Sequence, residues 1–424
     1  MGALNAQNEY SLHTKLKNMK NALVITALLI GSSSFAQTFT NYTAADGLLS
    51  DNVSCLDVDA TDAIWFGTQL GVSVLDGSTW TSYTTADGLV DNNVTAIFVT
   101  STGDVWAGTD FGVSVLSGGS WTTYTTVEGL GNNQIKCINE DLDGDIWFGT
   151  NNGASELSGS TWTNLGTADG LPFGGVTALN IHSSGDIWMG SGLGGIIVYD
   201  GAVITTTLTE AEGLTDDRIR GIAMDDSDYR WIATSEGISV FDNSNTHTEN
   251  HTIIFTLPAP DTLNPIEDIK IDGQGIIWAG VYVDYLVTEG GVCAYNGNDW
   301  IEFHVSDGLV GPVVRQLAID GNDAVWIATS TGVSKLTDHT VGVNPAINDH
   351  ADVQMYPNPV SDALTITFDE APSTQIDIFS MTMQHIKSIR FDANQHKLTI
   401  PMTELSAGVY FVKMGEVVER IIVQ

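Results

Sequence analysis

The chain has 424 residues, of which 42% are apolar and 16% are charged, and 44 are glycine. This composition is typical of a globular, turn-rich protein and argues against general disorder. The 15 Lys and Arg face 52 Asp and Glu, which gives a net charge of −37. Such a surface repels phosphate backbones and anionic lipid, so we expect no nucleic-acid partner.

Residues 1–36 have the features of a secretory signal peptide. Lys20 precedes an apolar run over residues 22–30, and the small residues of Ser34–Ala36 form a cleavage site before Gln37. Met19 is a candidate for the true start of the chain. No later stretch approaches the length of an apolar membrane span. We therefore expect an exported protein without a transmembrane segment.

Three cysteines, Cys55, Cys137 and Cys293, are too few and too odd in number for a disulfide framework. Two of them lie where other copies of the repeat described below have Ala or Gly. We expect these two to be small buried apolar side chains, and we expect no redox chemistry from the three cysteines.

A short phrase, "DIWFGTNNGASEL" at residues 145–157, recurs along the chain in variant forms. Its tryptophans are Trp65, Trp106, Trp147, Trp188, Trp231, Trp278 and Trp326, with spacings of 41, 41, 41, 43, 47 and 48 residues. In each copy, short runs rich in Val, Ile, Thr, Trp and Tyr alternate with clusters of Gly, Asp, Asn and Ser. This pattern predicts four strands per copy, with the tryptophan in the core.

Four strands per 40–50 residues are typical of a β-propeller blade. The seventh copy lacks an outer strand after residue 336, whereas "TFTNYTAADGL" at residues 38–48 matches "WTSYTTADGL" at residues 80–89. The sequence thus predicts an all-β fold: a seven-bladed β-propeller over residues 37–343, closed by the N-terminal strand. No helical periodicity competes with this interpretation.

The repeat resembles the two-component regulator propeller repeat. The shared string is "DGL-x-x-N-x-V-x-x-I" followed by "D-G-x-I-W-I-G-T-x-x-G", and the resemblance covers about 300 residues. It fades in the sixth copy, where "FTLPAPDTLNPIEDI" replaces the DGL loop. The family occurs in Bacteroidota, in periplasmic sensors and in secreted proteins. The sensor's membrane span, kinase and DNA-binding parts find no counterpart here, so kinase signalling does not follow from the resemblance.

Composition changes again after Val343. A polar linker over residues 344–352 leads into a small β-sandwich-like domain at 353–424, which resembles the C-terminal sorting domain of type IX secretion. The residues that carry the motif are Tyr356, Pro357, Asn358, Pro359, Asp362, Gly408 and Tyr410. The resemblance implies the type IX machinery as a partner and a protein that is released or attached to the outer-membrane surface. The alternative is a sandwich domain for adhesion.

One face of the predicted propeller carries the DGL loops and the turns after the "WxGT" strands. The repeated acidic residues of the DGL loops suit the turns themselves. The loop of the sixth copy differs, because it adds two aromatics and two carboxylates that could hold a sugar ring. These residues are Tyr282, Asp284, Tyr285 and Glu289.

The propeller region has only seven cations, and five of them lie in or beside the innermost strands. Lys136, Arg220 and Arg315 share one position, eleven residues before the repeat tryptophan. We expect them to point towards the axis and to form an anion site for a carboxylate or sulfate of an acidic glycan. Internal pairing with Glu267 and Asp268 is the alternative.

No catalytic residue can be selected from the sequence. The nine histidines lack metal-binding spacing, and no nucleophile motif is present. "EDLDGDIW" at residues 140–147 resembles a fragment of a Ca²⁺ loop but lacks its remaining ligands, so we expect no metal or other cofactor. We expect a monomeric, non-catalytic module that binds a glycan or protein. The alternatives are a polysaccharide-degrading lyase or hydrolase that uses loop-face carboxylates, and a scaffold for another exported protein.

Overall fold

The computed structural model describes residues 38–252, 254–255, 264–281, 290–337 and 339, and much of the segment 354–423. The chain divides into two compact units, Met1–Val343 and Asn344–Gln424. Both are all-β, since the described residues contain no α-helix and only two 3₁₀ turns, Thr167–Asp169 and Val305–Asp307. Within the described part, no helix is long and apolar enough to cross a membrane.

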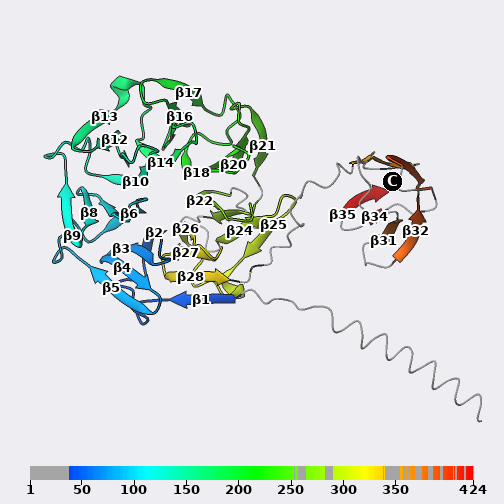
Figure 1. Ribbon diagram of the computed structural model, residues 1–424, viewed down its shortest axis with the longest axis horizontal. Coiled ribbons are helices and arrows are strands. Elements are labelled where there is room, and N and C mark those ends of the chain that lie inside the picture. The colour runs from blue at the N-terminus through cyan, green and yellow to red at the C-terminus, as the bar shows by residue number, and fades with distance from the viewer. Residues whose placement is uncertain are drawn as a thin grey trace, which may run out of the picture. The chain divides into compact units, whose positions relative to one another are not determined.

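The first unit consists of four-stranded antiparallel sheets that follow one another around a ring, and each sheet is a blade of the propeller (Figure 1). Blades one to three are β2 (Val53–Val58), β3 (Ile64–Thr68), β4 (Gly71–Asp76) and β5 (Thr79–Tyr83); β6 (Val94–Val99), β7 (Val105–Thr109), β8 (Val113–Ser117) and β9 (Ser120–Tyr124); and β10 (Ile135–Glu140), β11 (Ile146–Thr150), β12 (Gly153–Ser158) and β13 (Thr161–Leu165).

Blades four to six have the same order from the axis outward. They are β14 (Val176–Ile181), β15 (Ile187–Ser191), β16 (Ile196–Tyr199) and β17 (Ile204–Leu208); β18 (Ile219–Met224), β19 (Arg230–Thr234), β20 (Gly237–Phe241) and β21 (His247–His251); and β22 (Ile266–Ile271), β23 (Ile277–Val281), β24 (Gly291–Tyr295) and β25 (Trp300–Phe303). The predicted propeller fold is confirmed.

The sheet that follows blade six combines the two ends of the unit. β26 (Val314–Ile319), β27 (Val325–Thr329) and β28 (Gly332–Thr337) are joined by β1 (Thr38–Tyr42), which pairs antiparallel with β28. Tyr42 stacks on Trp326 with ring centroids 5.6 Å apart. We call this sheet blade seven.

The core of the propeller lies between neighbouring blades, because each sheet buries both faces. The second strand of every blade is buried along its whole length, and all seven repeat tryptophans belong to these strands. One apolar cluster, for example, joins Trp65 of blade one to Val94 and Ala107 of blade two.

The second unit contains two sheets. One has the order β29 (Gln354–Tyr356), β30 (Ala363–Thr367), β33 (Lys397–Pro401), and the other β32 (His385–Arg390), β31 (Gln375–Ser380), β34 (Gly408–Met414), β35 (Val417–Val423). Leu364, Ile378 and Val412 belong to a single apolar cluster that includes side chains from both sheets. This packing agrees with the predicted small β domain.

Candidate functional site at the channel mouth

A β-bulge at the second residue of every innermost strand shapes one end of the axial channel. In each blade the pairing with the second strand shifts between the first and third residues, as between Ile135 and Cys137. The bulged residue is left out of the ladder, which re-aims its side chain. The bulged residues are Ser54, Thr95, Lys136, Thr177, Arg220, Glu267 and Arg315.

These bulges lie where the DGL loops enter the innermost strands and where the second strands end, since Ile135 is paired with Thr150. We call this end of the propeller the mouth face. Two bulged threonines bind the next blade: Thr95 donates to the carbonyl of Ile135 at 2.8 Å, and Thr177 donates to that of Ile219 at 2.7 Å. The three basic bulge residues and Glu267 make different contacts.

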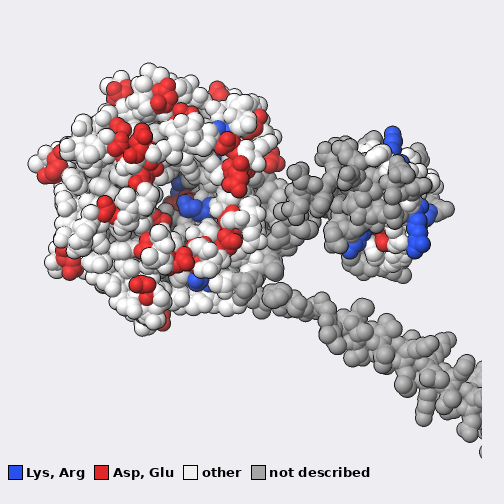
Figure 2. All heavy atoms as spheres, viewed as in Figure 1, with Lys and Arg blue, Asp and Glu red and all other residues white. Residues whose placement is uncertain are grey.

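A pocket of about 350 Å³ opens at the mouth beside blades three to six. It is lined by Lys136, Thr177, Gly192, Arg218, Ile219, Arg220, Ser235 and Glu267. Three cations and one carboxylate therefore meet in one concave site of a strongly acidic protein. In the space-filling view of one face, basic side chains also gather in the central hollow and acidic ones surround it (Figure 2).

Arg220 and Glu267 form an ion pair across the boundary between blades five and six. Arg220 donates from Nη1 to the Glu267 carboxylate and from Nε to the Ser235 hydroxyl, at 3.0 Å in the second case. Burial raises the pKa of Glu267, whereas the positive charges of Arg220 and Arg315 oppose that rise. The internal pairing that the sequence left open is thus present for Arg220.

The other two cations of the pocket are more exposed. Lys136 Nζ lies 3.9 Å from an oxygen of Asp110, and 37% of its side chain is exposed. Arg218 binds Asp216 through Nε and Nη2, each at 3.0 Å, and 53% of its side chain is exposed. The exposed parts of both side chains are accessible to a ligand.

The structure brings only part of the predicted site together. Lys136 and Arg220 line one pocket, and Arg218, which sequence reasoning did not select, completes its basic wall. Arg315 is not among the residues that line this pocket, and its Nε is buried without a hydrogen-bond partner. Tyr282, Asp284, Tyr285 and Glu289 lie outside the described residues.

The acidic residues of the DGL loops are occupied by their own turns. Asp87, for example, accepts from the amide of Thr84 at 2.8 Å, and Glu128 accepts from that of Thr125 at 2.7 Å. The same contact recurs at Asp46, Asp169, Glu212 and Asp307. These carboxylates shape the loops, as the turn interpretation predicted.

A second repeated carboxylate lies in the turn between the first and second strands of the blades, on the opposite face. In five blades an aspartate six residues before the tryptophan accepts from the indole Nε1, as Asp320 does from Trp326 at 2.9 Å. Asp141, Asp145 and Glu156 converge within 4.8 Å in blade three, but both oxygens of Asp141 already accept hydrogen bonds. Their convergence gives no ground for a metal site.

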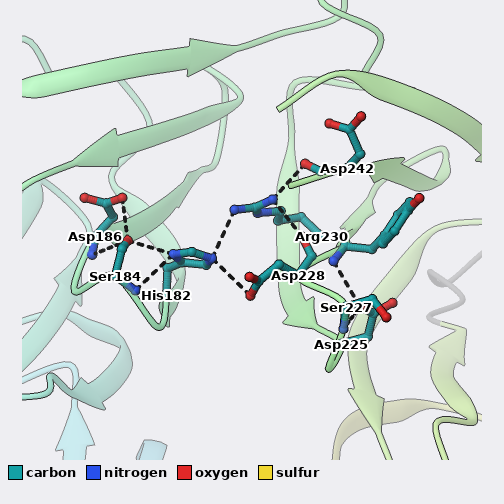
Figure 3. A network of polar contacts seen from close by, with 9 residues as sticks. His182, Ser184, Asp186, Asp225, Ser227, Asp228, Arg230 and Asp242 are labelled. Atoms are coloured by element: carbon teal, nitrogen blue, oxygen red, sulfur yellow. Dashed lines mark hydrogen bonds and ion pairs between the residues drawn. The ribbon is translucent and has the colours of Figure 1, made fainter. Parts of the chain in front are cut away.

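On this opposite face, a polar network joins blades four and five (Figure 3). Arg230 is almost fully buried, lies over the Trp188 ring and donates to the carbonyls of Asp228 and Asp242 at 2.6 and 2.7 Å. Its Nη2 lies 3.1 Å from His182 Nε2. Burial lowers the pKa of Arg230. Because arginine has no acceptor, His182 Nε2 must accept this hydrogen bond.

Comparisons with known proteins agree with this architecture. The model of the two-component regulator propeller matches residues 88–111 and 129–152, and that of the secretion system C-terminal sorting domain matches residues 354–424. The chain thus contains two-component regulator propeller repeats and a secretion system C-terminal sorting domain. The sorting domain indicates that the protein is secreted or lies on the cell surface. No curated protein matches the sequence.

Solved structures share the fold at low identity. The extracellular domain of the hybrid two-component system BT3049 from B. thetaiotaomicron is 16% identical, with a TM-score of 0.61 over 92% of this chain and 57% of that one. PorZ, a surface component of the type IX secretion system of Porphyromonas gingivalis, is 17% identical, with a TM-score of 0.56 over 90% and 61%. This chain thus spans about three fifths of the length of each.

Virginiamycin B lyase from Staphylococcus aureus is 18% identical, with a TM-score of 0.54 over 71% of this chain and 98% of the lyase. At these identities the likeness extends to the fold alone.

Among the sorting-motif residues, Tyr356 belongs to β29, and Gly408 and Tyr410 belong to β34. Tyr410 is buried in the apolar cluster of the second unit. Pro357, Asn358, Pro359 and Asp362 lie outside the described residues.

Proposed function

We propose that the protein is an exported, non-catalytic binding module whose channel mouth holds an anionic group of a glycan or protein ligand. The observation that carries this proposal is the pocket in which Lys136, Arg218 and Arg220 converge. In a chain of net charge −37, a local concentration of cations is unexpected unless it pairs internally or serves a ligand.

Each of the three cations has an acidic partner, but the contacts differ in strength. Arg220 is paired with Glu267 and Arg218 with Asp216 and, at 4.0 Å, Glu236, whereas the contact of Lys136 with Asp110 is long and exposed. Exposed ion pairs of that last kind contribute little to stability. A carboxylate or sulfate could therefore take hydrogen bonds from Lys136 and from the exposed part of the Arg218 guanidinium.

A signal peptide at residues 1–36 and removal of the sorting domain during export complete the proposed route. Both agree with a chain that bears a sorting domain and a propeller fold shared with extracellular proteins. In this proposal, the secretion machinery is the partner of residues 354–424, and the propeller meets its ligand outside the cell.

A second candidate function is cleavage of an acidic polysaccharide. Glu267 favours it, because burial raises the pKa of this carboxyl group, and a carboxyl group in a pocket that holds its proton more tightly is a better general acid. Release of new chain ends from polygalacturonate, abolished in Glu267→Gln, would establish an enzyme. Saturable binding with no new chain ends would support the binding module.

Binding should be measured with the full chain and four polymers: polygalacturonate, dextran sulfate, poly-L-glutamate and neutral dextran. We expect at least one anionic polymer to bind and dextran not to bind. The double variant Lys136→Ala/Arg218→Ala should weaken that binding by about tenfold or more, since each charged hydrogen bond contributes about 1.5 kcal/mol or more.

Lys397→Ala is the matched control, because it removes an exposed cation from the second unit and leaves the mouth intact. Equal binding of dextran and of the anionic polymers would contradict the proposal. So would anion binding that is unchanged in the double variant.

A further inference from the structure

Several large apolar side chains are exposed on the mouth face, and three of them lie near the basic pocket. Phe111, Phe173 and Leu193 are 63%, 79% and 65% exposed. Phe111 and Leu193 lie in the turns after the second strands of blades two and four, and Phe173 lies in the loop that leads into β14. We call these three residues the apolar rim.

Phe173 replaces a residue that other blades use to stabilise the same loop. At its position Asp91, Asn132 and Asp216 each accept a hydrogen bond from the backbone amide two residues later, at 2.8, 2.8 and 2.6 Å. A phenylalanine cannot make this bond. The two glycines that follow Phe173 instead take φ of 105° and 71°. The loop therefore lacks the side-chain hydrogen bond that these other blades have, and it exposes an aromatic ring instead. This exchange does not stabilise the loop.

The turn that holds Phe111 and Leu193 varies between blades. Blade one also has an apolar residue at this position, Leu70, whereas blades three, five and seven have Asn152, Glu236 and Thr331. A large apolar side chain in an exposed turn gains little from the fold. Apolar residues at such places mark an interaction surface when they are grouped.

The apolar rim adjoins the basic pocket. Asp110, next to Phe111, lies 3.9 Å from Lys136 Nζ, and Gly192, next to Leu193, lines the pocket itself. The loop of Phe173 packs close to Leu193, because a Cβ added at Gly174 would lie 3.1 Å from the Leu193 Cβ. Cationic donors and exposed apolar residues therefore lie in neighbouring loops of the same face.

We propose that the mouth docks the carboxyl-terminal end of a partner polypeptide, with its terminal carboxylate in the basic pocket and its last side chains, large and apolar, on the apolar rim. This inference rests on the proposed function, and it selects a protein over a glycan. A polypeptide end joins a carboxylate to apolar side chains within one or two residues. A polysaccharide offers mainly hydroxyl groups, to which none of the three apolar-rim residues can hydrogen-bond, and the aliphatic Leu193 has no ring to stack on a sugar. A pocket of about 350 Å³ is also of the size that encloses a small ligand group.

The test is an array of immobilised pentapeptides that covers every combination of the last two residues, each made with a free carboxyl terminus and with a terminal amide. The full chain is applied as wild type, Phe173→Asn and Leu193→Asn. Asparagine is the native residue at both positions in blade three, so these variants should fold. Leu142→Ser is the control, since it removes an equally exposed apolar residue from the opposite face and copies Ser101 of blade two.

The expected result is selection of free-acid peptides that end in large apolar residues. Amidation should weaken this binding by about tenfold, and Phe173→Asn by severalfold, whereas Leu142→Ser should have no effect. The inference would be overturned if terminal amidation did not change the binding. It would also be overturned if Phe173→Asn and Leu193→Asn both bound as the wild type does.

The anionic polymers separate this inference from the function on which it rests. If polygalacturonate or dextran sulfate binds through Lys136 and Arg218 while no peptide is selected, the anion site stands and the polypeptide partner is wrong. If neither polymers nor peptides bind, both proposals fail.

Discussion

Asp57 shows how one residue of the innermost strand can limit the stability of the ring. It lies eight residues before Trp65, and its carboxylate accepts the amide of Val99 in the next blade at 2.7 Å. Asn139 and Asn180 occupy the same position in blades three and four and donate to carbonyls of the following blade. All three side chains join neighbouring blades, but only Asp57 brings a charge. Burial raises its pKa to about 6.

We predict that Asp57→Asn stabilises the protein at neutral pH. A carboxyl whose pKa rises on folding binds its proton more tightly in the folded state, so stability falls as pH increases from about 4 to about 6. A shift from 3.8 to about 6 corresponds to about 3 kcal/mol above that window. The variant should therefore raise the free energy of unfolding at pH 7.5 by about 1–3 kcal/mol.

Urea unfolding at pH 4 and pH 7.5 checks this prediction, and the gain should be absent at pH 4. Asn139→Asp is the reverse control. It should lower the free energy of unfolding at pH 7.5 but not at pH 4. A loss of stability in Asp57→Asn at pH 7.5 would show that the carboxylate, and not its neutral form, suits the site.

At the scale of the strand and the turn, two departures from the repeat meet in one place. His182 stands where five blades have the aspartate that binds the tryptophan, and Arg230 stands where the other blades have Val or Ile. The two side chains are 3.1 Å apart (Figure 3). His182 Nε2 also lies 3.2 Å from Asp228 Oδ1, so a proton on Nε2 would satisfy Asp228 but oppose Arg230.

We predict that His182→Asp stabilises the boundary between blades four and five. The new carboxylate would pair with the buried guanidinium of Arg230, whose Nε has no hydrogen-bond partner. Pairing a buried charge should add about 1–2 kcal/mol, which corresponds to a rise of a few degrees in the melting temperature. Differential scanning calorimetry measures it, with Asp225→His in blade five as the opposite change. A lower melting temperature for His182→Asp would contradict the account.

The elements were more predictable than their contacts. Regular spacing and alternating apolar residues identify the blade strands, and the likeness of residues 38–48 to residues 80–89 points to β1, which pairs with β28. The candidate site could be predicted from the sequence only in part. A repeat position shared by Lys136 and Arg220 indicated two pocket residues, but their partners come from other blades, and no local pattern predicts which carboxylate faces which cation.

Arg218 illustrates the remaining gap. It lies one residue before β18 and shares no repeat position with Lys136, so its part in the pocket depends on the conformation of the loop that Asp216 stabilises. The exposure of Phe173 could have been suspected, because phenylalanine is the exception among Asp, Asn, Ser and Gly at that position.

The whole molecule separates its tasks between two units. The sorting domain directs export, and the propeller carries the surface that we propose to bind the ligand. In the face shown, acidic side chains surround a central hollow in which basic side chains gather (Figure 2). An acidic exterior of this kind favours solubility.

We predict that deletion of residues 354–424 prevents passage across the outer membrane without unfolding the propeller. The two units have separate apolar clusters, so the remaining chain keeps its core. In a bacterium with type IX secretion, cell fractionation should recover the shortened protein from the periplasm, and the full chain from the surface or the medium. Surface delivery of the shortened protein would refute this role of the domain.

The most direct test of the central claim is a titration of the full chain with the best-binding anionic polymer or free-acid peptide, for wild type and Lys136→Glu. Lys136 is exposed at the mouth and its contact with Asp110 is weak, so the reversal of its charge leaves the fold intact. We predict that Lys136→Glu loses affinity by about tenfold or more, with the largest loss at low salt, and that Lys397→Ala binds as the wild type does. Equal affinity of wild type and Lys136→Glu at low salt would contradict this prediction.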